Sequence, residues 1–164
     1  MASDDQVPVA DRSSGQERRL GQQSAAEVRA RRERLRAELI NLEQVLSGPA
    51  ADAEGWVAQV RTAAVAMAET LREHVEETEG PDGMLAQVAT DAPWLEGRLL
   101  QLREEHGQLV ADADALIARC DRPGVTAQQL RDEALHLLQQ VSRHRQQGTD
   151  LLYDAYLVDI SAAD

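Results

Sequence analysis

The sequence predicts an all-α protein: an antiparallel, up-down-up-down four-helix bundle preceded by a flexible N-terminal tail. In four long stretches, apolar residues recur at alternating steps of three and four, the spacing of a helix face that packs against neighbouring helices. Short segments rich in Gly and Pro separate these stretches. Aromatic residues make up only 2% of the chain, so Leu, Val and Ala must build the core, which favours close-packed helices over a sheet sandwich.

The N-terminal tail is predicted over residues 1–23, because this segment has few large apolar side chains and cannot bury enough surface to fold. The bundle domain is predicted over residues 24–160. Its first helix, 24–48, starts at Ser24, a residue type that caps helix N-termini. Its second helix, 52–79, ends at a Gly-Pro pair, since proline cannot continue a helix.

The second half of the domain contains a connection and two further helices. Residues 80–92 are predicted to form a less regular connection that includes the short apolar stretch MLAQV. The third helix, 93–120, begins beside a proline and ends before the turn sequence DRPG. The fourth helix, 126–158, is capped by Thr126, and Gln129 stands three residues later in the position of a capping box.

Each predicted helix carries one inward stripe. In the third helix the stripe is Leu95, Leu99, Leu102, His106, Leu109, Ala113 and Leu116. In the fourth it is Leu130, Ala134, Leu137, Val141, His144, Gly148, Leu151, Ala155 and Val158. The second helix contributes Val60, Ala64, Met67, Leu71, His74 and Thr78, and the first Val28, Arg32, Leu35, Leu39, Leu42 and Leu46. One stripe per helix, facing a shared axis, is the pattern of a four-helix bundle.

Composition and charge exclude several function classes. A net charge of −12 argues against nucleic-acid binding, which needs a basic surface. No apolar run is long enough to span a membrane, and the single cysteine, Cys120, fits a reducing cytoplasm. No Ser-His-Asp or Cys-His arrangement and no Gly-rich phosphate loop is present, so we expect a cytoplasmic binding protein rather than an enzyme.

Three of the four histidines fall on the inward stripes of three different helices: His74, His106 and His144. His136 is flanked on its helix face by polar residues and is expected at the surface. A single inward histidine is usually satisfied by a hydrogen bond, but three need a partner for each ring nitrogen in a core of Leu and Ala. A shared metal ion would be a partner for one nitrogen of each ring. The alternative is a polar core in which the histidines take up protons or bond to buried water.

An acidic run, Glu73, Glu76, Glu77 and Glu79, surrounds the end of the second helix. The simplest interpretation is a solvated face. Negative charge is nevertheless unfavourable at a helix C-terminus. The run therefore indicates that one of these carboxylates, Glu77 by preference, has a cationic partner.

Three stretches, LREHVEETEGPDGML, LREEHGQLVADADAL and VSRHRQQGTDLLYDAYLVDI, resemble the motif-bearing segments of the hemerythrin-like, or HHE cation-binding, domains. The resemblance covers about residues 25–160 and suggests a bacterial branch of that family. It implies a four-helix bundle with a non-haem di-iron centre that binds oxygen, senses iron or oxygen, or takes part in redox chemistry.

The sequence departs from that family's ligand pattern on every helix. The first predicted helix contains no histidine. Thr78 stands where the family has a glutamate four residues after the histidine, and Val110 stands where it has a second histidine. On the fourth helix Gly148 and Thr149 replace the second ligand, with Asp150 just beyond. The remaining donors are too few for two octahedral irons.

We therefore expect one metal ion, or weakly held iron, bound by His74, Glu77, His106 and His144. Non-haem iron is the cofactor that the resemblance implies; imidazole ligation also suits zinc and manganese. The expected role is oxygen or iron sensing, storage or redox buffering, with dioxygen as a further ligand. Two alternatives remain: a metal-free degenerate module that binds other proteins, and a bundle that loosens when its histidines become charged at low pH.

The predicted helix ends raise one difficulty for a shared site. His74 stands about five residues before the end of its helix, and His106 about twelve after the start of the next. At a rise of about 1.5 Å per residue their heights differ by roughly 10 Å. They can meet only if the third helix overhangs the second or if the 80–92 segment extends it.

Overall fold

The computed structural model describes residues 29–30, 32–49 and 53–156. The chain divides into two units, Met1–Arg34 and Leu35–Asp164. Residues 29, 30 and 32–34 of the first unit are described, and all of them are helical. The predicted tail at 1–23 lies outside the described residues, as does the predicted start of the first helix. The second unit is described below by itself.

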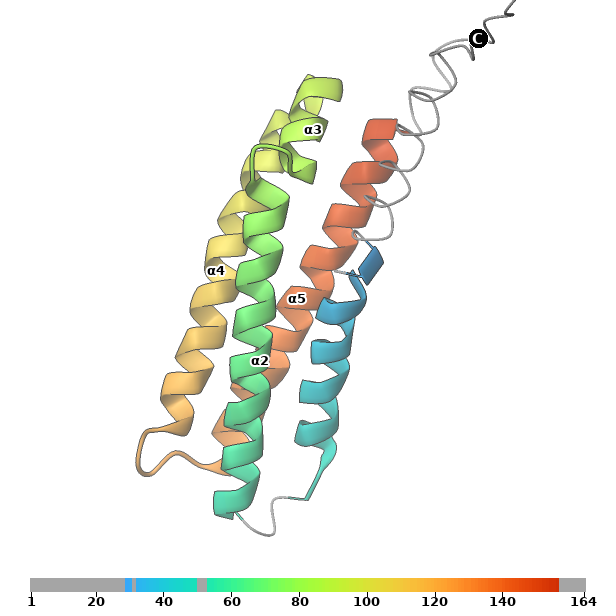
Figure 1. The fold of residues 1–164 in the computed structure, drawn as a ribbon. Helices are drawn as coiled ribbons and strands as arrows, with labels where there is room; N and C mark the ends of the chain where they lie inside the picture. Colours follow the sequence, from blue (N-terminus) through green and yellow to red (C-terminus); the bar gives the residue numbers. More distant parts are fainter. Residues whose placement is uncertain (1–28, 31, 50–52, 157–164) are drawn as a thin grey trace, which may run out of the picture. The chain divides into compact units, whose positions relative to one another are not determined.

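In the described part of the second unit the regular structure is entirely helical, which confirms the all-α prediction there (Figure 1). Residues 35–47 form the first helical segment. The elements that follow are α2 (Ala53–Glu79), α3 (Met84–Asp91), the 3-10 turn η1 (Pro93–Leu95), α4 (Glu96–Cys120) and α5 (Ala127–Tyr156). Helix α4 packs against both α2 and α5.

The segment 80–92, predicted as a less regular connection, is more regular than expected, because most of it forms helix α3. The stretch MLAQV begins this helix, and Leu85 and Val88 are fully buried. Helix α3 contacts α2, α4 and α5, and it lies beyond the end of α2 in Figure 1. Eight residues are too few for a stable isolated helix, so the burial of this apolar face is what holds α3 in place.

Helix α4 resolves the height difficulty. It starts at Glu96, ten residues before His106, while α2 continues for only five residues after His74. The two imidazole centroids are nevertheless 5.2 Å apart. The first residues of α4 therefore extend past the end of α2, by roughly 8 Å at the standard helical rise, and α3 packs beside them (Figure 1).

The core consists of two apolar clusters. The larger includes residues of the first helical segment, of α2 and of the adjoining halves of α4 and α5, among them Leu42, Met67, Leu109 and Val141. The smaller lies around α3 and is formed by Leu85, Val88, Ala92, Leu95, Leu99, Leu102, Leu151 and Ala155. The predicted stripes supply most of these residues; the residues of α3 and also Trp56, Ala63, Ala68 and Ala92 lie outside them.

Polar contacts fix the helix ends at the opposite pole from α3. Trp56 Nε1 donates to the carbonyl oxygen of Val45 at 3.1 Å, and the Arg131 guanidinium stacks on the Trp56 ring. Arg131 also donates to the carbonyls of Leu46 and Gly48, so it caps the end of the first helical segment. The predicted capping box at the start of α5 is confirmed, since the Gln129 amide side chain and the Thr126 hydroxyl bond each other's backbone N–H.

The outer faces of the long helices are charged. Arg61 and Arg72 of α2 pair with Asp121 and Asp114, respectively, and all four side chains are about half exposed. Such pairs contribute little stability, about 0–1 kcal/mol each. Across the described residues, no helix has the length and apolar character that a membrane span requires.

The turn between α2 and α3 generates a testable prediction. A Cβ on Gly83 would lie 2.4 Å from the carbonyl oxygen of Thr78, a backbone atom that cannot move aside. Gly83→Ala should therefore displace α3 and lower the free energy of unfolding by about 1–3 kcal/mol. The matched control is Gly107→Ala in α4, where no described atom lies within 4 Å of the added methyl group; it should be neutral or stabilising by up to about 1 kcal/mol. Urea unfolding curves measure both, and equal stabilities would contradict the described packing of α3.

Candidate metal centre

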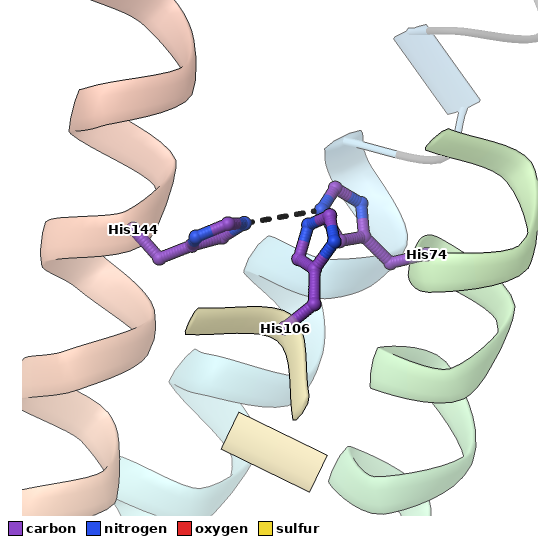
Figure 2. Close-up of side chains that lie close together, drawn as sticks. All are labelled: His74, His106 and His144. Carbon is purple, nitrogen blue, oxygen red and sulfur yellow. Dashed lines mark hydrogen bonds between the residues drawn. The ribbon is translucent and has the colours of Figure 1, made fainter. Parts of the chain in front are cut away.

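Three imidazoles meet inside the second unit. His74 of α2, His106 of α4 and His144 of α5 point toward one another (Figure 2). Their ring centroids are 5.2 Å apart for His74–His106, 5.6 Å for His74–His144 and 4.7 Å for His106–His144. One possible ligand atom from each residue lies within 4.8 Å of the other two. The three inward stripes thus converge as the spacing predicts.

The histidines form a polar layer between the two apolar clusters. Along α4, His106 stands between Leu102 of the smaller cluster and Leu109 of the larger. Along α5, His144 lies between Val141 and Leu151, which again belong to different clusters. His106 is 2% exposed and His144 5%, and His74 is partly buried. The layer is therefore shielded by apolar side chains on both sides.

Two carboxylates orient two of the rings. Glu79 Oε1, at the end of α2, lies 2.6 Å from His106 Nδ1. Glu105 Oε2 of α4 lies 3.0 Å from His144 Nδ1. Each carboxylate side chain is about a quarter to a third exposed, at 31% for Glu79 and 26% for Glu105. Both carboxylates therefore reach solvent while each contacts a buried imidazole.

These bonds determine where the ring protons lie. An ionised carboxylate only accepts hydrogen bonds, so His106 and His144 carry their proton on Nδ1. Their Nε2 atoms keep a free lone pair, which is the tautomer that a metal ligand needs. His74 Nε2 lies 3.4 Å from His144 Nε2. Without an ion, the Nε2–H of His74 donates to His144; with an ion, His74 carries its proton on Nδ1 instead.

The surroundings disfavour protonated rings. Burial lowers the pKa of His74 from 6.5 to about 3, and the neighbouring charges of His106 and His144 add to the effect. Burial also lowers the pKa of His144, although the hydrogen bond and charge of Glu105 oppose it. At neutral pH these two rings are uncharged, so a metal ion would not have to displace a proton from the site at either position.

The donor geometry suits one small ion. With bonds of about 2.0–2.1 Å, two nitrogens of a tetrahedral zinc site lie about 3.4 Å apart, which matches the separation of His74 Nε2 and His144 Nε2. The other separations, at most 4.8 Å, can close by side-chain adjustment. Three protein nitrogens leave a fourth position for water or another small ligand, the donor set of an open site.

The predicted ligand Glu77, the residues near the missing second-ligand positions and His136 have other surroundings. Glu77 is partly buried and does not belong to the three-histidine cluster; its role as a ligand stays a prediction. The Thr78 hydroxyl donates to the backbone carbonyl of His74, one helical turn earlier. Asp150 accepts from Gln146 at the surface. His136 is exposed and pairs with Gln140, which confirms its predicted place at the surface.

Of the two carboxylates that contact the rings, Glu79 belongs to the acidic run that the sequence singles out, and Glu105 does not. Glu77 was the preferred member of the acidic run, and Glu79, the last residue of α2, is the member that contacts His106. Its unfavourable place at a helix C-terminus was the signal. Glu105 has no comparable signal, because only the pairing of α4 with α5 brings it beside His144.

No family model, no curated protein and no solved structure matches the chain. The candidate site therefore has to be judged on its own residues and their geometry.

The low pKa of His74 predicts an acid-labile fold. Because the unfolded chain takes up the proton near pH 6.5 and the folded chain only near pH 3, stability is fully present above pH 6.5 and is lost as the pH falls between these values. One such group changes the free energy of unfolding by up to about 1.4 kcal/mol per pH unit. In chelator, the loss between pH 7 and pH 5 should be up to about 2 kcal/mol smaller in His74→Gln than in the wild type.

The exposed residue His136 provides the matched control. His136→Gln should lose stability with falling pH in the same way as the wild type, as urea unfolding at each pH would show. Equal pH profiles for His74→Gln and His136→Gln would contradict a buried, neutral His74.

Proposed function

We propose that this protein binds one divalent transition-metal ion through His74, His106 and His144. The observation that carries the proposal is the convergence of three imidazoles from three helices in a layer enclosed by apolar side chains. The proposed setting is an antiparallel bundle in the cytoplasm. The proposed role is metal binding rather than catalysis.

Charge supports a divalent ion. Imidazoles bind a metal ion in their neutral form and so add no charge to the site, whereas Glu79 and Glu105 add carboxylates through their hydrogen bonds to two of the rings. A dication would balance this pair of carboxylates in a region that apolar clusters shield from solvent. The carboxylates would also make the ligand nitrogens more basic.

Zinc and iron are the two ions to compare. Three imidazole nitrogens bind Zn(II) more tightly than Fe(II) or Mn(II) when the ions are equally available. The resemblance to hemerythrin-like domains implies non-haem iron, with dioxygen at the open position and a role in oxygen or iron sensing, storage or redox buffering. The donor set supports a mononuclear form of that site, because the second ligand on each helix is missing.

A metal-free module is the second candidate, and one observation favours it. Every ring in the layer has a protein partner without any ion: Glu79 for His106, Glu105 for His144, and His144 for His74. Such a network can satisfy buried imidazoles by itself. The bundle would then act in protein–protein interaction, and replacing His106 by Leu would raise its stability, since Glu79 could turn to solvent.

Metal content separates the two candidates. Protein stripped with chelator and then dialysed against Zn(II) or Fe(II) should hold about one ion per chain, measured by elemental analysis. His106→Ala and His144→Ala should each reduce this to less than about a tenth of an equivalent, because two imidazoles and water hold a divalent ion weakly. His136→Ala should bind as the wild type does. A wild-type content below about a tenth of an equivalent of either ion would contradict the proposal and favour the metal-free module.

The carboxylate partners should tune the affinity. Glu105→Gln keeps the shape of the side chain but removes the charge that polarises His144, so the affinity for Zn(II) should fall about 10–100-fold. Glu104→Gln, next to it on the exposed face of α4, should change the affinity less than about 2-fold. Competition with a chromophoric chelator measures both. Equal affinities for the two variants would show that Glu105 does not act through the site.

A further inference from the structure

The last residue of α2 connects the histidine layer to helix α3. Glu79 Oε1 lies 2.6 Å from His106 Nδ1, and α2 ends at Glu79. Only residues 80–83 separate it from α3, which begins at Met84. The residue that contacts one of the three proposed ligands is therefore also the residue before the turn that leads into α3.

This turn is packed closely against the end of α2. The backbone N–H of Gly80 donates to the carbonyl oxygen of Glu76, and the N–H of Gly83 donates to the carbonyl oxygen of Gly80. A Cβ on Gly83 would lie 2.4 Å from the carbonyl oxygen of Thr78, so the two backbone segments touch. The N–H of Gln87, in the first turn of α3, donates to the carbonyl oxygen of Gly83. We therefore expect α3 and the end of α2 to open together.

The end of α2 and α3 are the elements in which local opening is easiest. The last turn of α2, which the structure describes in full, contains no basic residue. It contains Glu76, Glu77 and Glu79, and carboxylates are unfavourable at a helix C-terminus. Helix α3 has only eight residues and is held by its buried apolar face. Short elements of this kind open before the whole fold unfolds. Such opening would take Glu79 away from His106.

We propose that metal binding at the three histidines stabilises α3 in its packed position against α2, α4 and α5, and that Glu79 couples the two. This inference rests on the proposed metal function. An imidazole bound to a metal through Nε2 donates a stronger hydrogen bond from Nδ1, and the carboxylate that accepts this bond raises the metal affinity about 10–100-fold. Coupling between two equilibria is reciprocal. If opening of α3 removes Glu79 from His106 and lowers the affinity by this factor, bound metal disfavours the opening by the same factor.

Packed and open α3 present different surfaces. Leu85 and Val88 are fully buried while α3 is packed, and they would be accessible to solvent or to another protein when it opens. Bound metal would keep these side chains hidden, and loss of the metal would expose them. A metal sensor needs such a readout and a storage protein does not, so the coupling favours sensing among the proposed roles.

Hydrogen exchange of the α3 amide protons tests the coupling. Exchange is measured by NMR on the full chain, in chelator and at saturating Zn(II), with the zinc content determined on the same samples. In the wild type, zinc should slow exchange of these protons about 10–100-fold. In Glu79→Gln, saturated at a higher zinc concentration, it should slow them less than about 2-fold. The matched control is Glu76→Gln, at an exposed carboxylate in the same turn of α2, which should behave as the wild type.

The affinity for zinc gives a second measure of the same coupling. Glu79→Gln should lower it about 10–100-fold, and this factor should agree within about 3-fold with the protection of α3 that the variant loses. Glu76→Gln should stay within about 2-fold of the wild type. Equal zinc-dependent protection of α3 in the wild type and in Glu79→Gln would overturn the inference, as would a wild type that holds zinc without any protection of α3. A wild type that binds no zinc would instead overturn the proposed function, and this inference with it.

Discussion

The need to satisfy three buried imidazoles constrains the centre of this protein. An imidazole has two ring nitrogens, and each loses water when the ring enters an apolar core. Two of the three rings, those of His106 and His144, meet this need with a carboxylate on Nδ1. The two glutamates that accept these bonds are partly exposed. Their carboxylates therefore keep contact with solvent. What remains is a set of ring nitrogens, one from each histidine, within 4.8 Å of one another.

The rest of the described fold makes that arrangement possible. The end of α2 supplies both His74 and Glu79, and the overhang of α4 brings His106 to their level. Helix α3 then completes the apolar cluster on that side of the layer, with Leu85 and Val88 fully buried. Without α3, the overhanging residues of α4 would expose their apolar stripe. The position of the site and the presence of α3 are therefore linked.

The sequence predicted most of the side chains that face inward, because the period of a helix fixes the angle of each residue about its axis. The exceptions are Arg32, which is exposed although it was placed on a stripe, and the buried residues Trp56, Ala63 and Ala68, which were not. The sequence could not fix the height of one helix against another. For that reason the relative heights of the His74 and His106 rings follow only from the structure, in which α4 extends past the end of α2. The run MLAQV was too short for periodicity to distinguish a helix from a loop. Glu105 faces His144 only because α4 packs against α5, and that pairing is a tertiary contact that no local pattern encodes.

The hemerythrin-like domains that the sequence resembles and the described histidine cluster imply different metal centres. The resemblance implies two irons with a full set of ligands, whereas Thr78 and Val110 occupy positions where further ligands would be needed. The three nitrogens that remain suit a single ion with an open position. The hydrogen-bonded glutamates give this reduced set the neutral charge balance that a dication requires.

The central claim is that Nε2 atoms of His74, His106 and His144 bind one ion together. The most direct measurement is the NMR spectrum of ¹¹³Cd bound to protein labelled with ¹⁵N-histidine, with cadmium in place of zinc. The account predicts one cadmium signal with one-bond couplings to three Nε2 nitrogens, assigned to these residues by single substitutions, and no coupling to His136. A spectrum in which bound cadmium couples to none of the three, or to only one of them, would contradict it.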